Sequence, residues 1–348
     1  MGRNAEPTRR FGALAGDPMS GPLPPALVLA AGLGTRLRPL TDVRAKPAVP
    51  VAGRPLVLRV LDWLAGQGVR DVVLNLHHRP ETITRVVGHG AAAGVRVRYS
   101  WEPVVLGSAG GPRQALALLG PRFFIVNGDT LTTLSLGALA DTHARTGAAV
   151  TLAVAPHPDP DRYGGVVVTG DGRVRGFTRA GGRAAAHFVG LQMVEAAVFG
   201  SLPAGRPAAT VGGLYDRLVA ASDNGRREPV RAHRVTDEFL DVGTPADYLS
   251  ASLAVARREG RESSPVGAGS TIDSTAALTR TVVWDDVAVG AGCRVDECIL
   301  ADGVTLPPGA MLRRRICVPA TCVGDGKGEP DIGNAVVHPL DGLPVSAR

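Results

Sequence analysis

Lysine is almost missing from this chain: only Lys46 and Lys327 occur among 38 basic residues. Arginine is used at almost every position where either basic residue would be tolerated. A remaining lysine therefore indicates a position that needs a compact ammonium group rather than a wide planar guanidinium. Lys46 is followed by Pro47 and comes shortly after a glycine-rich loop. We interpret it as a phosphate contact, the alternative being that its survival there is chance.

Aromatic residues are also scarce, at 4% of the chain, and the arginines behind the net charge of +6 are scattered rather than clustered. A nucleic-acid-binding protein would show a basic stripe or cluster. We therefore predict no nucleic-acid partner. The modest positive balance suits small anionic substrates and is equally compatible with an ordinary solvated surface.

Long apolar runs are missing too, and none reaches the roughly 18 residues that a membrane-spanning helix needs. The N-terminal residues carry arginine, glycine and proline without an apolar centre, so they do not resemble a secretory signal. We predict a disordered tail over residues 1–22, with Met19 as an alternative start. No membrane partner is predicted, and a cytoplasmic location is expected.

The only cysteines, Cys293, Cys298, Cys317 and Cys322, all lie in the last quarter of the chain. Their C-x4-C spacing is wider than in most structural zinc sites, and no histidine is near. Buried packing residues are the favoured prediction, and a zinc site is the alternative.

An apolar residue recurs every six positions in this region, and sets of three recur every 17 positions. The repeating residues are Val266, Ile272 and Leu278, then Val283, Val289 and Val295, then Leu300, Leu306 and Leu312, then Cys317 and Val323. This period describes three-sided coils with one inward side chain per face. We predict a short left-handed parallel β-helix over residues 259–325 and a C-terminal tail over 326–348, the last 20 residues being unstructured.

Residues 23–258 alternate between apolar strand patterns and helical patterns. Predicted strands cover 26–31, 71–76, 95–99 and 123–126, and predicted helices cover 54–68, 80–87 and a segment containing 115–119. Such alternation is typical of an α/β fold with a doubly wound, mostly parallel sheet. Ligands of these sheets bind at the carboxyl ends of the strands.

The first strand is followed at once by Gly32, Gly34, Thr35 and Arg36. A glycine loop at this point can turn backbone N–H groups toward phosphate oxygens, and the arginine supplies countercharge. A dinucleotide fingerprint would need a third glycine where Leu37 stands, and a Walker loop would end in Gly-Lys-Ser/Thr. We predict a nucleotide-binding loop that also includes Ala30 and Ala31.

The full pattern from Val28 to Pro47 is G-x-G-x-R-x-x-P-x-T followed by A-K-P. It resembles the signature of sugar-1-phosphate nucleotidylyltransferases (NDP-sugar pyrophosphorylases), except that Ala45 replaces a proline. The resemblance runs from about residue 24 to residue 253. It implies transfer of a nucleoside monophosphate from an NTP to a sugar 1-phosphate with release of pyrophosphate, a Mg²⁺ cofactor, and a role in NDP-sugar supply for cell-envelope polysaccharide.

The resemblance also implies roles for individual residues. Asp129, at the tip of a predicted strand, and Asp241, in a D-x-G-T motif, would be the catalytic metal ligands. Arg36 would hold the leaving pyrophosphate and Lys46 would neutralise charge at the reacting phosphates. Taken alone, each aspartate could equally be an ordinary turn residue or helix cap.

Further positions are implied for the base and the sugar. The small-residue loop before a helix, Leu106–Gly111, would line the base, and the nucleotide-binding set adds Gly107, Ser108, Gly110, Gly111, Asn127 and Gly128. The strand-rich region 150–194 would carry the sugar side, with Gly165 and Gly190 near the sugar. The usual Glu-Lys-Pro is replaced by Thr178-Arg179-Ala180, so mannose, glucose and N-acetylmuramate 1-phosphates all stay open.

Two other functions are weighed against this enzyme. A non-catalytic, sugar-nucleotide-binding regulatory subunit would keep the fold, but it would be expected to lose the catalytic side chains that are present here. A β-helix acyltransferase would need a general base, and no histidine lies between Val266 and Val323. The β-helix could form a homo-oligomer, and its removal is expected to affect assembly or regulation more than chemistry.

Overall fold

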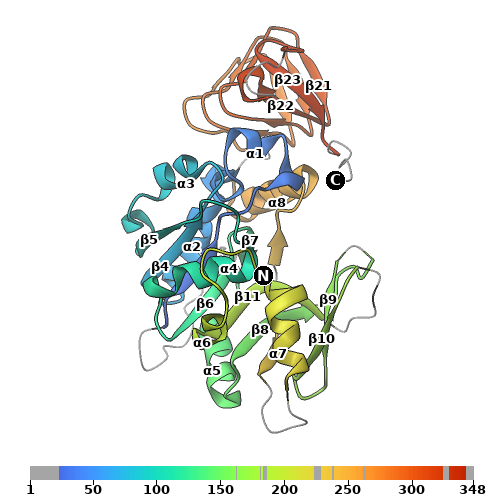
Figure 1. The fold of residues 1–348 in the computed structure, drawn as a ribbon. Coiled ribbons are helices and arrows are strands. Elements are labelled where there is room, and N and C mark those ends of the chain that lie inside the picture. Colours follow the sequence, from blue (N-terminus) through green and yellow to red (C-terminus); the bar gives the residue numbers. More distant parts are fainter. Residues whose placement is uncertain are drawn as a thin grey trace, which may run out of the picture.

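The computed structural model describes residues 23–161, 163–180, 182, 186–222, 229–236, 239–261, 264–323 and 329–341, with Phe239 and Asp241 described by backbone alone. The tail predicted over residues 1–22 lies outside the described residues. Figure 1 shows an α/β domain with a β-helix stacked against α1 and α8, and strands β9 and β10 at the opposite end. Within the described residues, no helix has both the length and the apolarity needed to cross a membrane.

Four parallel strands form the centre of the α/β domain, in the order β6, β1, β4, β5. They are β1 (Ala26–Leu29), β4 (Asp71–Leu76), β5 (Arg96–Trp101) and β6 (Arg122–Asn127). The helices that accompany them are α2 (Leu56–Gly66), α3 (Pro80–Val87), α4 (Gly107–Ala115) and α5 (Leu136–Thr146). Leu29 pairs with Asn75 on one side and with Asn127 on the other, so three strand ends lie level at one edge.

The sheet continues from β6 through five further strands, which pair antiparallel except for β12 with β8, so it is mixed rather than wholly parallel. These strands are β8 (Val150–Pro156), β9 (Gly165–Val168), β10 (Val174–Thr178), β11 (Ala186–Glu195) and β12 (Val230–Arg234), with helices α6 (Ala197–Gly200) and α7 (Tyr215–Ala220). The strand-rich region predicted over 150–194 is therefore confirmed. Strand β11 joins it directly to the parallel half.

The prediction of a loop at Leu106–Gly111 is wrong, because Gly107 begins helix α4. The small residues serve close packing instead. A β-carbon at Gly111 would lie 2.7 Å from polar atoms of both Asn75 and Glu102, and one at Gly110 would lie 2.6 Å from the carbonyl oxygen of Arg206. A longer side chain at either position would push the helix away from its neighbours.

Two short strands bring distant parts of the chain together beside the sheet. Strand β7 (Thr130–Thr132) pairs antiparallel with β13 (Phe239–Asp241), and Thr130 lies opposite Asp241. Helix α8 (Pro245–Arg258) follows β13. Thr244 is the N-cap of this helix: its hydroxyl accepts from the backbone N–H of Asp247, whose carboxylate accepts from the N–H of Thr244.

The 17-residue period corresponds to three parallel sheets, as predicted. Val283 pairs with Leu300 and Leu300 with Cys317, while Val289 pairs with Leu306. The strands are β14 (Thr271–Ile272), β15 (Ala277–Thr279), β16 (Val282–Val283), β17 (Ala288–Val289), β18 (Arg294–Asp296), β19 (Ile299–Leu300), β20 (Thr305–Leu306), β21 (Met311–Arg313) and β22 (Arg315–Pro319). Cys293, Cys298 and Cys317 are buried, which confirms their packing role.

The repeat ends earlier than its period predicts. Val323 follows a 3₁₀ turn, Ala320–Cys322, and lies in no strand. Strand β23 (Ala335–Pro339) instead pairs antiparallel with β22. The prediction that the last 20 residues are unstructured is therefore wrong for this segment, because β23 covers an edge that β22 would otherwise expose.

Candidate active site

A cavity of about 330 Å³ opens at the carboxyl ends of β1, β4 and β6. The predicted residues that line it are Ala30, Ala31, Gly32, Gly34, Thr35, Arg36, Lys46, Gly107, Ser108, Asn127, Gly128 and Asp129. It is large enough for a nucleotide-sized ligand, since small-molecule sites begin at about 300 Å³. Parts of the chain more than a hundred residues apart thus meet in one concave site.

The glycine loop after β1 is shaped by Gly34, which has φ +63°. A β-carbon there would lie 2.7 Å from the Cγ2 of Thr41 and 3.2 Å from the Cβ of Lys46. The Thr41 hydroxyl donates to the carbonyl oxygen of Gly34 over 3.1 Å, and Thr41 is fully buried. The threonine of the motif therefore holds the loop rather than facing a ligand.

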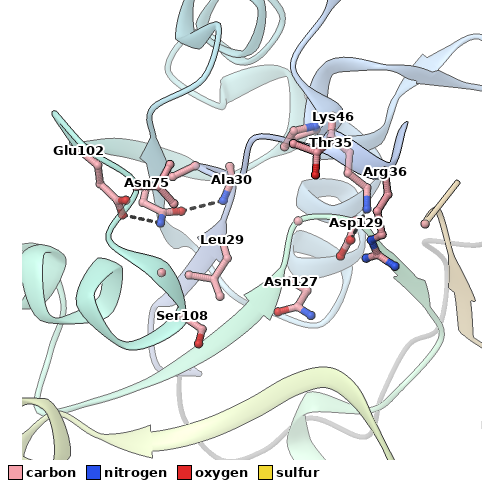
Figure 2. A pocket seen from close by; sticks show the side chains of 18 residues that line it. Leu29, Ala30, Thr35, Arg36, Lys46, Asn75, Glu102, Ser108, Asn127 and Asp129 are labelled. Carbon is pink, nitrogen blue, oxygen red and sulfur yellow. Dashed lines mark hydrogen bonds and ion pairs between the residues drawn. The ribbon is translucent and has the colours of Figure 1, made fainter. Parts of the chain in front are cut away.

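Lys46 and Asp129 form an ion pair at one end of the cavity, with 2.5 Å between Nζ and Oδ2. Lys46 begins a 3₁₀ turn, Lys46–Ala48, and Asp129 follows the tip of β6. Their side chains are 12% and 25% exposed, so both remain within reach of a ligand while partly desolvated. Arg36 and Thr35 lie beside them (Figure 2).

Two glycines allow the strand tips to approach each other closely. The N–H of Gly128 donates to the carbonyl oxygen of Leu29 over 3.0 Å, and a β-carbon on Gly128 would lie only 2.6 Å from that oxygen. Gly190, with φ +81°, lies against Asn127, where a β-carbon would come within 2.6 Å of Nδ2. Gly190 therefore packs against Asn127, which lines the cavity, but is not itself a lining residue.

The remaining predicted residues are not among those that line the cavity. The backbone of Asp241 lies opposite Thr130, the residue after Asp129. Its side chain is outside the described part of the structure, so its role as a metal ligand stays a prediction. Gly110 and Gly111 pack behind the cavity wall. Gly165 begins β9, opposite Thr178, and is not among the residues that line the cavity.

Asn75 and Glu102 were not among the predicted site residues, yet they form the other end of the cavity (Figure 2). The Asn75 Oδ1 accepts from the N–H of Ala30 over 2.7 Å, and its Nδ2 donates to Glu102 Oε1 over 2.7 Å. Glu102 Oε2 accepts from the N–H of Leu106 over 2.8 Å, and Glu102 is fully buried. Asn75 lies in β4 level with Leu29, and Glu102 directly follows β5, so applying the strand-end rule to every strand would have found both.

Leu29, Pro47, Val105 and Gly243 also line the cavity without having been predicted. Leu29 and Pro47 adjoin predicted residues in the sequence. Gly243 stands between Asp241 and the N-cap of α8, so the β7–β13 pairing delivers the whole D-x-G-T motif to this edge.

Comparison with protein families agrees with this geometry. Residues 25–179 match the family model described as nucleotidyl transferase, and residues 250–314 match a GlmU-like C-terminal hexapeptide model. A mannose-1-phosphate guanylyltransferase of Mycobacterium tuberculosis is 30% identical over 301 residues, which cover 83% of each chain. The chain belongs to the nucleotidyl transferase (NDP-sugar pyrophosphorylase) family.

Within this family, an N-acetylmuramate alpha-1-phosphate uridylyltransferase of Neisseria meningitidis is 35% identical over 225 residues, covering 63% of this chain and 93% of that protein. The solved structure of HddC from Yersinia pseudotuberculosis complexed with GMP-PN has the same fold, with a TM-score of 0.55 at 22% identity, covering 66% of this chain and 98% of HddC.

Family membership confirms the predicted reaction class, which is nucleotidyl transfer to a sugar 1-phosphate. Members of the family typically use Mg²⁺. The regulatory-subunit alternative is therefore set aside in favour of the enzyme.

Proposed function

We propose that this enzyme transfers GMP from GTP to a hexose 1-phosphate, with mannose 1-phosphate as the preferred acceptor. The observation that carries the choice of base is the buried carboxylate of Glu102 at one end of the cavity. Uridylyl transfer to N-acetylmuramate 1-phosphate is the second candidate, supported by the 35% identical uridylyltransferase.

An ionised carboxylate only accepts hydrogen bonds, and its two oxygens offer about four acceptor positions. Glu102 uses one position on each oxygen, for Asn75 Nδ2 and for the N–H of Leu106. Guanine presents two adjacent donors, N1–H and the N2 amino group, along one edge. Uracil presents a single N–H between two carbonyl acceptors, which a carboxylate would repel. The remaining acceptor positions of Glu102 therefore suit guanine better.

The opposite end of the cavity suits the triphosphate. The loop after β1 presents backbone N–H groups, and Arg36 and Lys46 add positive charge there. The phosphate oxygen of a sugar 1-phosphate is already an anion, so its in-line attack on the α-phosphorus needs charge neutralisation and alignment rather than a strong base. Lys46 would exchange Asp129 for the reacting phosphates when the substrates bind.

Asp129 and Asp241 are the residues that would hold Mg²⁺. Carboxylate oxygens are the ligands this ion prefers, and the 25% exposed carboxylate of Asp129 faces the cavity beside the proposed triphosphate position. When bound, Mg²⁺ supplies positive charge to the phosphate groups. Lys46 keeps Asp129 paired until then, which avoids an uncompensated carboxylate in a partly buried position.

The length over which the relatives align with this chain supports mannose 1-phosphate as the acceptor. The mannose-1-phosphate guanylyltransferase of Mycobacterium tuberculosis aligns over 83% of this chain, whereas the uridylyltransferase aligns over 63%. Asn127 lines the cavity and Gly190 packs against it, so the sugar is proposed to bind on this side.

The test is a matrix of GTP, UTP, ATP and dTTP against mannose, glucose, N-acetylglucosamine and N-acetylmuramate 1-phosphates, with pyrophosphate release as the readout. We expect kcat/KM for GTP with mannose 1-phosphate to exceed every other pair by about tenfold or more, which is about 1.4 kcal/mol of discrimination. A higher kcat/KM for UTP with N-acetylmuramate 1-phosphate would replace the proposal with the second candidate.

A further inference from the structure

The segment that carries Lys46 is packed against the β-helix. Leu37, Leu40 and Val49 share one hydrophobic core with Trp284 and Ile299. Figure 1 shows α1 (Leu40–Val43) directly beneath the β-helix. The two parts therefore meet through a continuous apolar interface, not through a linker alone.

Arg44 crosses this interface as a clamp. Its guanidinium donates through Nε to Asp302 Oδ2 over 2.5 Å and through one terminal nitrogen to Asp302 Oδ1 over 2.7 Å. The same terminal nitrogen donates to Asp285 Oδ2 over 2.5 Å, and the Arg44 side chain is only 15% exposed. Paired N–H donors of this kind fix direction as well as distance.

Trp284 of the β-helix and Tyr248 of α8 support this clamp. The guanidinium carbon of Arg44 lies 5.6 Å from the centre of the fully buried Trp284 ring. The Trp284 indole N–H donates to the Tyr248 hydroxyl over 2.7 Å, and that hydroxyl donates to the carbonyl oxygen of Pro50 over 2.5 Å. The contacts thus join the β-helix to both ends of the stretch from Arg44 to Pro50.

The segment from Leu40 to Pro50, which carries Lys46, has little intrinsic stability. Helix α1 has only four residues, and helices this short do not persist without tertiary contacts. Its other polar anchors include the Thr41 carbonyl, bonded to His78 Nε2 over 2.9 Å, and the Ala45 N–H, which donates to Thr82 over 3.1 Å. Arg44 stands two residues before Lys46 and is the anchor nearest to it that reaches the β-helix.

We propose that Arg44 is a positioning residue that holds Lys46 at the reacting phosphates, so that the β-helix completes the active site through Asp285 and Asp302 without contacting substrate. This extends the proposed function and rests on the proposed role of Lys46. It revises the expectation that the β-helix can be lost without much effect on chemistry. A displacement of about 1 Å at a group aligned with the reacting atoms can cost about a hundredfold in rate.

The clamp is partly desolvated, which guides the choice of variants. Burial raises the pKa of the Asp302 carboxyl, and hydrogen bonds from Arg44 oppose the shift. Removing Arg44 alone would leave Asp302 without its cation, so Arg44→Met risks instability. Asp302→Asn weakens the clamp from the β-helix side while keeping its shape, and it provides the second variant.

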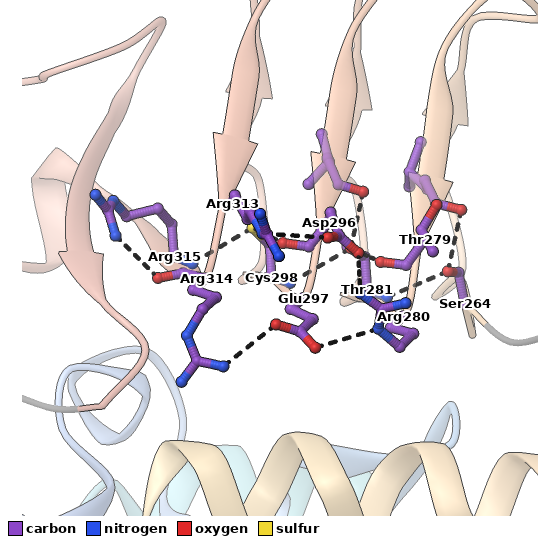
Figure 3. A network of polar contacts seen from close by, with 12 residues as sticks. Ser264, Thr279, Arg280, Thr281, Asp296, Glu297, Cys298, Arg313, Arg314 and Arg315 are labelled. Carbon is purple, nitrogen blue, oxygen red and sulfur yellow. Dashed lines mark hydrogen bonds and ion pairs between the residues drawn. The ribbon is translucent and has the colours of Figure 1, made fainter.

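Arg280 offers a matched control. It also binds two carboxylates, with 2.7 Å to Asp296 and 3.2 Å to Glu297, but both belong to the β-helix (Figure 3). Arg280→Met therefore removes an arginine that binds two carboxylates but has no described ion pair to the segment carrying Lys46; its side chain is 48% exposed, against 15% for Arg44. The Lys46→Met variant, measured alongside, reports separately on the role of the lysine itself.

The experiment measures kcat, KM and thermal unfolding in the full-length chain, together with the rate at which an amine-acylating reagent modifies Lys46. Since the chain has only two lysines, peptide mapping resolves the modification at Lys46 directly. We expect Arg44→Met and Asp302→Asn to lower kcat about tenfold or more, with smaller changes in the KM for NTP. Lys46 should be acylated severalfold faster in both, and Arg280→Met should match the wild type in both readouts.

If Asp302→Asn is folded at the assay temperature, with kcat within about twofold of wild type and unchanged Lys46 acylation, the proposal is overturned even where Arg44→Met fails to fold. A fall in thermal stability with normal kcat would assign the clamp a structural role only and would also overturn it. Full activity of Lys46→Met would instead refute the role of Lys46 in the proposed function, irrespective of which NTP is preferred.

Discussion

The Nζ of Lys46 lies 2.5 Å from Oδ2 of Asp129, although 83 residues separate the two in the sequence. One charge comes from a 3₁₀ turn after the signature loop and the other from the tip of β6. Each neutralises the other in a partly buried position, and each is proposed to change partner when substrates enter.

Asp129→Asn keeps the size of the side chain but removes its charge. We expect turnover to fall about a hundredfold or more, as the loss of a preorganised charged group typically causes. Pyrophosphate release measured across Mg²⁺ concentrations checks this. Asp62→Asn is the control, because Asp62 forms a comparable pair with Arg54 outside the cavity. Near-normal Mg²⁺-dependent release by Asp129→Asn would refute the metal assignment.

Lys46→Arg keeps the charge but replaces a compact ammonium with a planar fork. The Lys46 side chain is only 12% exposed and is paired with Asp129, so a wider head group has little open space around it. We expect strong impairment of turnover in steady-state assays. Activity within about twofold of wild type, less than about 0.4 kcal/mol of barrier, would show that any cation suffices.

Gly34→Ala and Gly147→Ala form a matched pair, since both glycines have left-handed φ angles, +63° and +61°. Both substitutions should cost about 1 kcal/mol of folding free energy from backbone strain. Only Gly34 has neighbours in the way, with Thr41 Cγ2 at 2.7 Å, while nothing lies within 4 Å of the Gly147 position. We expect turnover to fall only in Gly34→Ala, measured alongside urea unfolding; equal turnover in the two variants would contradict the proposed shape of the loop.

Glu102→Gln tests base recognition. The amide keeps one acceptor oxygen and places a donor where Asn75 Nδ2 or the Leu106 N–H now donates. We expect the ratio of kcat/KM for GTP over UTP to fall about tenfold, or 1.4 kcal/mol. The partly exposed Glu195, which does not line the cavity, provides the control Glu195→Gln. An unchanged ratio would mean that another group reads the base.

His143 predicts a pH dependence of stability. It is buried in α5, where its ring bonds Thr151 over 2.8 Å and Glu195 over 3.1 Å. Burial lowers the pKa of His143 below its usual value, more than the Glu195 contact raises it. The unfolded chain therefore binds the proton more readily, so this contribution to stability is present above about pH 6.5 and is lost as the pH falls through the lower folded pKa.

Urea unfolding at pH 7.5 and 5.5 measures this contribution. We expect the wild type to lose more stability on acidification than His143→Gln, because the variant lacks the titrating ring. The difference between the two chains isolates His143 from other groups. An equal or smaller loss in the wild type would show that Glu195 stabilises the protonated ring enough to cancel the effect of burial.

The chain's own pattern determined much of the architecture. The 17-residue period placed Val283, Leu300 and Cys317 in register, because each coil repeats the same inward position. The glycine loop and Asp129 were predictable because they follow buried strands directly, and parallel strands end at one edge. In contrast, the small residues at Gly107–Gly111 predicted a loop but form helix α4, since short side chains serve close packing as well as flexibility.

Other features depended on contacts that no local pattern encodes. The strand-end rule could place Glu102 at the cavity, but not predict its bond to Asn75, 27 residues away. Arg44 lies 258 residues from its partner Asp302. A buried carboxylate or a clamped arginine is identified by the partners that the fold brings to it, because its desolvation and hydrogen bonds exist only after packing. The sequence by itself determined the predicted strands, the coils and the position of the glycine loop. Only the tertiary structure decided which charges face the cavity and which join the β-helix to the segment carrying Lys46, because those charges meet across chain separations that carry no periodic signal.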